Sequence, residues 1–284
     1  MDCIDVIFFQ AELAPEKLAV VAQGTVISYA RLALGIVSAQ QRLAAAGLAV
    51  GATVGLHVSH PIDNFVLACA LYRMKIASAP IVTSPDAYLD NIAFDAVLVD
   101  SINPLISAKQ PSAKIFLVDT AWFQDKVNFD VAQRSHAARG DMNWTCRLAC
   151  YPDDVRLPAV VKTSAAALEA QLVGYALSAP SDWERMISIA PFASQLAFVL
   201  GLSALTQGRT VCFADVSTAR SLIVAFHHHY LVGSVTDFTA LLAQQNATYI
   251  ALTGLRGAEG DHAGLRMRVA EDRVRRDRDQ ALRH

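Results

Sequence analysis

Short apolar runs of strand length alternate along this chain with longer segments of helical periodicity. The runs at 79–82, 96–99 and 114–118 are hydrophobic at nearly every position. Such runs predict strands buried on both faces, which are typical of a parallel sheet covered by helices on either side. Further strands are predicted at 18–21, 25–28, 53–58, 186–190, 210–214 and 231–235, and helices at 29–46, 164–177, 195–207, 217–228 and 237–245. The predicted fold class is α/β, with layered sheets and helices on both faces.

Glycine and proline mark several element boundaries. Gly47 follows the helix at 29–46 and is expected to end it, because glycine readily adopts the left-handed conformation found there. The sequence Ser59-His60-Pro61 opens the next helix, since proline is favoured in a first helical turn. Ala22-Gln23-Gly24 separates two predicted strands and indicates a β-hairpin with a three-residue loop.

One segment raises the question of a membrane span. Residues 186–208 run for 23 positions without a charge, which meets the length criterion for a spanning helix. Pro191 interrupts this run, and several serines, glutamines and a threonine lie within it. A buried strand at 186–190 followed by a packed helix at 195–207 fits these breaks better. We therefore predict a protein without a membrane span.

Composition excludes several other classes. The 284 residues are 54% hydrophobic and 18% charged, which excludes disorder of the whole chain. The formal net charge of −2 provides no basic field for a nucleic-acid partner. Five cysteines are an odd number for a disulfide scaffold, and Cys146 and Cys150 lack the second ligand pair of a zinc finger. Without positive charge at the N-terminus for a signal peptide, we expect a reduced, cytoplasmic protein.

The C-terminal segment has a different character. Residues 256–284 contain eight arginines and six acidic residues among 29 positions. This composition predicts a charged tail, either a short solvated helix or an unfolded extension, after a domain at 1–255. The abrupt change near residue 256 also suggests translation in a shifted reading frame. Reading the nucleotide sequence past codon 255 in the other two frames tests this hypothesis.

Several segments resemble the N-terminal part of the adenylate-forming superfamily, which includes acyl-CoA synthetases and the adenylation domains of peptide synthetases. Residues 27–32 resemble its T-Y-x-E-L helix entry, and residues 45–56 resemble its L-x-x-x-G-V-x-x-G-D-x-V-A-L stretch. Residues 59–80 and 207–211 are similar to later segments of the same family, so the resemblance extends from about residue 8 to about 255. Lys75 departs from it, because the family has a helix-ending glycine there.

The resemblance places a phosphate-binding loop, S/T-S-G-S/T-T-G-x-P-K in the family, at residues 151–159. Here the loop reads Tyr-Pro-Asp-Asp-Val-Arg-Leu-Pro-Ala, so both glycines and the lysine are absent. Two adjacent carboxylates would face the ATP phosphates, which is an unfavourable like-charge contact. The candidate nucleotide-binding positions are Tyr151, Pro152, Asp153, Asp154, Val155, Arg156, Pro158, Ala159 and Thr163. We interpret this loop as degenerate.

The resemblance also implies an acyl pocket after the strand at 186–190, where the family has P-L-F-H-x-x-G. The candidate pocket residues are Pro191, Phe192 and Ser194, and the family's histidine is missing. The family's V-P-P turn also lacks both prolines at 234–237. The ribose-binding aspartate, the adenine motif and the C-terminal catalytic lysine of the family would all fall beyond residue 284. ATP with magnesium and CoA are the family's ligands, and we expect none of them to bind tightly.

Other candidate sites have simpler interpretations. His227, His228 and His229 are consecutive and cannot converge on one ion from a helix, so we expect them in a last helical turn. Asp153 and Asp154 are more typical of a solvated turn than of a metal site. No G-x-S-x-G is present to indicate a serine hydrolase. We expect no metal site and no catalytic residue within this chain.

Two classes of function remain open. One is an acyl- or aryl-CoA-ligase-like subunit that a partner chain completes, which predicts ATP-dependent pyrophosphate exchange only with that partner. The other is an inactive relative that keeps the fold as a binding module. A partly uncovered sheet would favour a protein partner or self-association.

Overall fold

The computed structural model describes residues 2–81, 85–123, 141–150, 160–179, 183–225, 229–233, 237, 240–241 and 255–259. Its strands form two six-stranded sheets, named sheet A and sheet B below. The strands are β1 (Leu18–Ala22), β2 (Thr25–Ser28), β3 (Thr53–His57), β4 (Ala77–Pro80), β5 (Ala96–Val99), β6 (Lys114–Leu117), β7 (Thr145–Cys150), β8 (Val160–Ser164), β9 (Arg185–Ser188), β10 (Thr210–Phe213), β11 (His229–Val232) and β12 (Leu255–Glu259). The helices are α1 (Cys3–Leu13), α2 (Tyr29–Ala45), α3 (Pro61–Arg73), α4 (Pro85–Asn91), α5 (Pro104–Lys109), the 3-10 helix η1 (Thr120–Phe123), α7 (Ala165–Ser178), α8 (Gln195–Thr206) and α9 (Val216–Ala225).

The two sheets share one spatial arrangement of strands but differ in connectivity, because the hairpin comes first along the chain in sheet A and last in sheet B. Sheet A has the strand order β12-β11-β9-β10-β1-β2, and sheet B has the order β6-β5-β3-β4-β7-β8. In each sheet, four successive strands are parallel, and a hairpin (β1–β2 or β7–β8) adds one parallel and one antiparallel strand at one side. The predicted parallel sheet is therefore present twice, each time with a hairpin at its edge.

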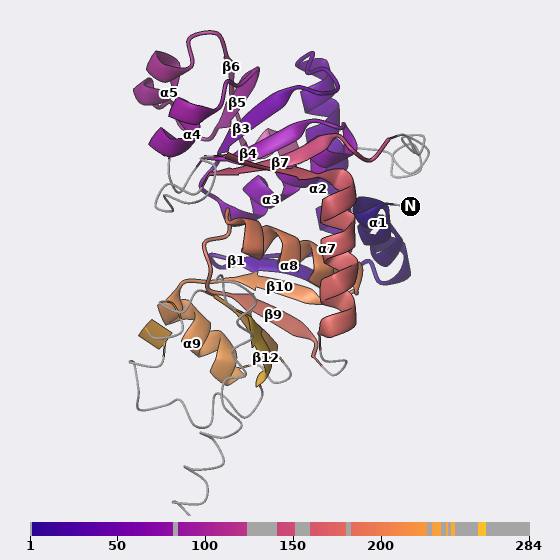
Figure 1. The fold of residues 1–284 in the computed structure, drawn as a ribbon. Helices are drawn as coiled ribbons and strands as arrows, with labels where there is room; N and C mark the ends of the chain where they lie inside the picture. Colours follow the sequence, from indigo (N-terminus) through magenta and orange to yellow (C-terminus); the bar gives the residue numbers. More distant parts are fainter. Residues whose placement is uncertain are drawn as a thin grey trace, which may run out of the picture.

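Helices α3 and α8 lie between the two sheets, with sheet B above and sheet A below in the view of Figure 1. Both helices are buried around most of their circumference, which fits their nearly continuous apolar sequences. Phe65 of α3 contacts Phe198 of α8 and Phe213 of β10, with ring centroids 5.6 and 6.0 Å apart. One hydrophobic core thus joins both sheets.

Polar residues at the first turns set the starts of several helices. The Asp2 carboxylate accepts hydrogen bonds from the backbone N–H groups of Ile4 and Asp5, and the Asp5 carboxylate accepts one from the Asp2 N–H. This capping box explains α1, which the sequence analysis did not predict. Ser28, Asn103, Ser164 and Ser194 cap α2, α5, α7 and α8 through side-chain oxygens.

Several predicted boundaries shift in the structure. Ala22 pairs directly with Thr25, so the first hairpin has a two-residue turn instead of the predicted three-residue loop. Gln23 and Gly24 in this turn both have positive φ, 48° and 77°, as a type I′ turn requires.

His229 begins β11, so the prediction that it ends a helix is wrong, and His227 and His228 lie outside the described residues. β12 begins at the predicted boundary between domain and tail, and residues 260–284 lie outside the described residues.

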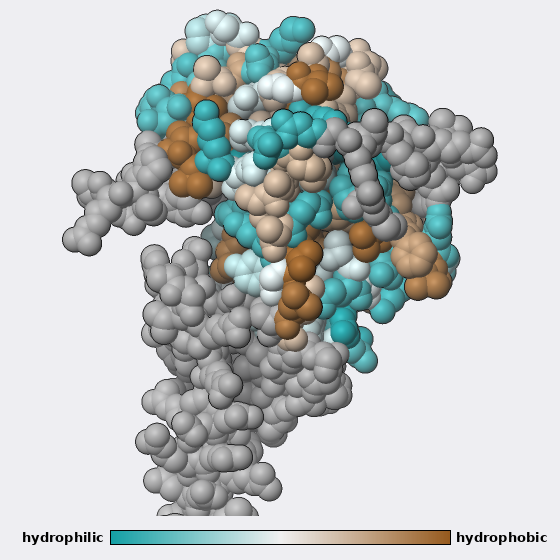
Figure 2. Space-filling view, turned by 45° about the vertical axis from the view of Figure 1, so that its right-hand side comes forward, coloured by the Kyte–Doolittle hydropathy of each residue, from teal (hydrophilic) through white to brown (hydrophobic). Residues whose placement is uncertain are grey.

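The segment at 186–208 divides as predicted. β9 occupies its start and α8 its second half, with Pro191 between them. Among the helices that the structure describes, none has the length and apolar character needed to cross a membrane. On the face shown in Figure 2, apolar atoms form separate groups among hydrophilic ones. A partner or self-association stays a prediction.

Candidate functional site

The strand order of sheet A creates a topological switch point between β9 and β11. The chain passes from β9 to β10 through α8, and then crosses back past β9 to reach β11 after α9. α8 packs on the face with Met186 and Val211, whereas α9 packs on the opposite face with Ile187 and Cys212. Ligands of open α/β sheets bind outside the carboxyl ends of strands where connections diverge in this way. The residues that follow β9 and β11 therefore form the candidate site.

The turn after β9 contains the three predicted pocket residues. The Ser194 N–H donates to the Pro191 carbonyl over 2.8 Å, which closes the turn. The Ser194 hydroxyl accepts from the Ala197 N–H over 3.1 Å and caps α8, so this oxygen is engaged in structure. Phe192 is half-buried against the central core, and Pro191 is exposed. The structure thus places Phe192 as the inward apolar group and Pro191 as the outward one.

Gln195 is the first residue of α8, at the base of this turn. Both its amide nitrogen Nε2 and its amide oxygen Oε1 are buried, and neither has a hydrogen-bond partner. An unsatisfied buried amide costs about 1–3 kcal/mol, so its retention calls for an explanation. At the carboxyl edge of a switch point, the amide is a ready donor and acceptor for a ligand. The sequence analysis did not select it, although it is the first polar residue before a strongly apolar stretch.

Arg147 of β7 connects sheet B to this turn. Its side chain is 1% exposed, and Nη2 donates to the Ala193 carbonyl over 3.0 Å. The guanidinium carbon lies 4.0 Å from the centroid of the Phe198 ring, which is a cation–π contact. Nη1 lies 3.5 Å from the Ser78 hydroxyl. Sequence reasoning missed this residue, whose signal is a single charge within the strand sequence Thr-Cys-Arg-Leu-Ala-Cys.

The hairpin β7–β8 holds Thr163, the one candidate nucleotide-binding residue among those that the structure describes. Thr163 is buried and stands opposite Arg147 in the antiparallel register, and its carbonyl accepts from the Cys146 thiol over 3.3 Å. Arg147 therefore has Thr163 beside it and the turn at 191–194 at its far end. The other candidate nucleotide-binding positions, residues 151–159, lie outside the described residues, and Cys150 and Val160 form the last pair before them.

β11 contributes a close backbone approach. A Cβ atom at Gly233 would lie 2.5 Å from Cγ1 of Ile189, closer than real side chains come. The Ile189 N–H donates to the Val232 carbonyl over 2.7 Å. This hydrogen bond joins the ends of β9 and β11 at the switch point, and the close approach is possible because residue 233 carries no side chain.

The equivalent edge of sheet B, after β3 and β5, is occupied by a polar contact of its own. The Asp100 carboxylate accepts a hydrogen bond from the Ser59 N–H over 2.6 Å and a short one from the Ser59 hydroxyl. Burial raises the pKa of Asp100, but the Ser59 hydrogen bonds outweigh that effect and hold it below its usual value. The Asp100 carboxylate therefore joins the loop after β5 to the loop after β3.

Other chemistry is not supported in the part of the chain that the structure describes. Burial raises the pKa of the Cys146 thiol to about 12 and that of Cys212 to about 11, so neither is a thiolate nucleophile at neutral pH. Within the described ranges, no group of three or more His, Cys, Asp or Glu residues could hold a metal ion.

Comparison with known proteins identifies the fold. No protein-family model and no curated protein matches the chain. The N-terminal domain of FACL13 from Mycobacterium tuberculosis matches with a TM-score of 0.77 and 15% identity, covering 98% of this chain and 74% of that one. MatB from Rhodopseudomonas palustris matches with a TM-score of 0.71 and 19% identity, covering 93% and 56%. o-Succinylbenzoate CoA synthetase from Bacillus subtilis matches with a TM-score of 0.66 and 15% identity, covering 85% and 51%.

These matches confirm the predicted fold. The chain has the fold of the N-terminal part of acyl-CoA synthetases and spans about half the length of the Bacillus subtilis synthetase and of MatB. Structures of the Bacillus subtilis synthetase hold AMP and the acyl-adenylate intermediate OSB-AMP. At these levels of identity, the likeness shows the fold alone.

Proposed function

We propose that this chain is an acyl- or aryl-CoA-ligase-like protein that binds a small acyl or aryl ligand but does not, by itself, activate it with ATP. The observation that carries the binding part is the buried, unpartnered Gln195 amide at the switch point of sheet A. Phe192 supplies an apolar surface in the same turn, and Arg147 fixes that turn from the opposite sheet. A carboxylic acid or its ester has the polar and apolar groups that this combination recognises.

The residues of this chain do not fit an ATP polyphosphate. The candidate loop at 151–159 has two aspartates against one arginine, no glycine and no lysine. It therefore lacks the glycines that allow close backbone approach to the phosphates, and its net charge is negative. The Thr163 side chain, which follows this loop, is buried beside Arg147. ATP chemistry would therefore depend on groups that these residues do not provide.

The ATP part is tested by calorimetry with ATP and magnesium, and with AMP. We expect no saturable isotherm at micromolar protein concentration and no carboxylate-dependent pyrophosphate exchange. A matched variant, Asp153→Gly/Arg156→Gly/Ala159→Lys, restores the glycines and the lysine and is expected to gain measurable ATP binding. A saturable isotherm with the unmodified protein contradicts the proposal. Exchange that arises only after a second chain is added would favour a ligase completed by a partner.

The ligand part is tested by the substitution Gln195→Leu. Removing a buried amide that has no partner is expected to raise the free energy of unfolding by about 1 kcal/mol, since its desolvation cost disappears. The same change should weaken binding of acyl and aryl acids by about tenfold, because the ligand loses its hydrogen-bonding group. A panel of aliphatic and aromatic carboxylates, followed by ligand-observed NMR, measures the second effect. Equal binding by both proteins would place the ligand elsewhere.

A further inference from the structure

A cavity lies at the amino edge of sheet B, where its parallel strands begin. Its volume is about 410 Å³, within the range of small-molecule sites. Its wall includes Thr53 and Ala77, where β3 and β4 begin, and the outer surface of β7 and β8. Its polar and aromatic lining groups are Thr53, Lys75, Asn91, Trp144, Thr145 and Lys162. We call this cavity the amino-edge pocket.

Lys75 occupies a backbone position that normally belongs to glycine. Helices α2, α3 and α8 all end in the same hydrogen-bonding arrangement, a Schellman motif, with a left-handed residue just past the helix. That residue is Gly47 in α2 and Gly208 in α8, both with φ of 72°, but Lys75 in α3 with φ of 56°. A side chain in this conformation strains the backbone, and such strain is concentrated at functional sites.

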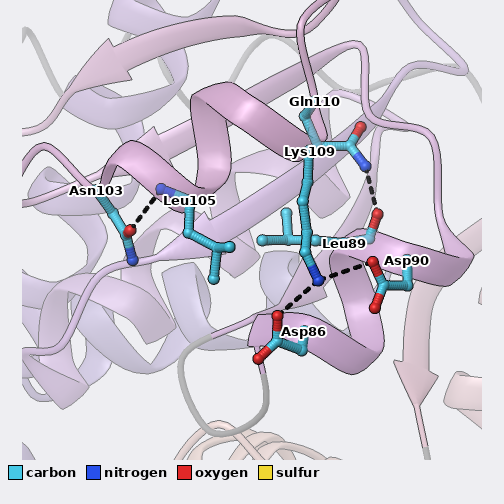
Figure 3. Close-up of polar contacts among 7 residues, drawn as sticks. All are labelled: Asp86, Leu89, Asp90, Asn103, Leu105, Lys109 and Gln110. Carbon is cyan, nitrogen blue, oxygen red and sulfur yellow. Dashed lines mark hydrogen bonds and ion pairs between the residues drawn. The ribbon is translucent and has the colours of Figure 1, made fainter.

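The two lysines of the amino-edge pocket are not neutralised within the described part of the chain. Neither Lys75 nor Lys162 has a carboxylate partner there. Lys109, outside the pocket, shows the ordinary arrangement: its ammonium lies 2.6 Å from Asp86 and 2.8 Å from Asp90 (Figure 3). Asp95 is an acid at the same edge of the sheet, and its carboxylate accepts from the Thr53 N–H over 2.8 Å. The two lysines outnumber this one carboxylate, and the surplus positive charge attracts an anion.

The pocket wall is held rigid by neighbouring residues. The Gln110 amide nitrogen donates to the Leu89 carbonyl over 2.8 Å (Figure 3) and to the Ile92 carbonyl over 2.9 Å. These bonds fix the end of α4 where it forms the wall. On the other side, the Trp144 ring packs on the Tyr72 ring with centroids 5.2 Å apart. A site fixed before binding loses less entropy when the ligand arrives.

We propose that the amino-edge pocket binds a small phosphate monoester that carries an aromatic ring. Lys75 and Lys162 supply charge-assisted hydrogen bonds to the phosphate oxygens, and the threonine hydroxyls add neutral ones. Trp144 offers its indole to the aromatic part of the ligand. The strained conformation of Lys75 is kept because it points a cation into the pocket at a position where glycine would be the more stable residue. This site is separate from the proposed acyl site.

The test uses phenyl phosphate and isothermal titration calorimetry on the full chain. Lys75→Gly is expected to raise Tm by about 3 °C, because glycine removes the backbone strain, and still to weaken phenyl phosphate binding about tenfold. Lys162→Gln should weaken it by a similar factor at unchanged Tm. Lys114→Gln, an exposed lysine on β6 outside the pocket, is the matched control and should leave affinity unchanged. Affinity for phenyl phosphate should also fall as salt is added.

The results separate this site from the acyl site. Gln195→Leu should leave phenyl phosphate binding unchanged, so either proposal can fail alone. Absence of saturable binding of phenyl phosphate overturns the amino-edge site. So does binding that is equally strong in the Lys75→Gly and Lys162→Gln variants, since the ligand then lies elsewhere. Binding of inorganic phosphate as tight as that of phenyl phosphate would refute the role of Trp144.

Discussion

Replacing Arg147 with alanine is expected to lower the free energy of unfolding by about 3–5 kcal/mol. The substitution empties a fully buried volume, removes the contact with the Phe198 ring and leaves the Ala193 carbonyl without its donor. Chemical denaturation monitored by circular dichroism measures the change. Because the donor holds the turn at 191–194, hydrogen exchange at the Ser194 N–H should also accelerate beyond what the global loss predicts.

Arg147→Met is the matched control for this prediction. Methionine keeps most of the apolar stem and removes a buried charge, and such exchanges are often close to neutral in stability. We expect a loss of no more than about 1.5 kcal/mol, again with faster exchange at Ser194, because the hydrogen bond to Ala193 is lost in both variants. Slow exchange at Ser194 in both proteins would show that Arg147 does not position the turn.

Phe65→Ala is expected to have an effect of similar size, about 4 kcal/mol, for a different reason. The Phe65 ring fills the space between α3, α8 and β10, and Gly201 of α8 lets it pack close to the helix backbone. Truncation leaves a cavity where the two sheets are joined. Urea unfolding of the variant, followed by circular dichroism and by tryptophan fluorescence, should show this loss of stability. The transitions seen by the two probes should no longer coincide.

The variant Phe65→Leu distinguishes a loss of packed volume from a loss of the link between the two sheets. Leucine retains much of the volume, so we expect a loss of about 1–2 kcal/mol and coincident transitions. If Phe65→Ala costs less than about 1 kcal/mol, the contact between the two sheets is not the main link between them.

Local sequence was sufficient for most of the fold. Consecutive hydrophobic residues at 96–99 identified a strand that is buried on both faces, and the proline after His60 marked the start of α3. The run at 114–118 was predicted to be buried in the same way, but that prediction is wrong: β6 is the edge strand of sheet B, and its Ile115 and Leu117 are exposed. The turn residues did not determine the length of the first hairpin loop, because a Gln-Gly pair suits loops of two and of three residues. The helix at 3–13 was missed although its capping residues, Asp2 and Asp5, are visible in the sequence.

The candidate site could be predicted only in part. Pro191, Phe192 and Ser194 could be selected because they lie in one short segment that resembles a family motif, and their role as pocket residues stays a prediction. Arg147 and Gly233 were not selected, because their roles depend on strand order: one reaches across from the other sheet, and the other meets Ile189 only when β9 and β11 are neighbours. Nothing local to Gln195 shows that its amide lacks a partner, since that depends on every surrounding element.

Sheet A is built from two distant parts of the chain, β1–β2 and β9–β12, and this has a consequence for folding during synthesis. Its hairpin β1–β2 leaves the ribosome early, but the strand it joins comes much later: Leu18 and Thr210, whose side-chain hydroxyl donates to the Leu18 carbonyl over 2.8 Å, are 192 residues apart. At about 5–20 residues per second, this interval lasts about 10–40 s. Sheet B, which is continuous from β3 to β8, is complete by then. The hairpin β1–β2 therefore remains unpaired next to the folded sheet B until β10 has been synthesised. During this interval its apolar surface is exposed and can bind chaperones or aggregate.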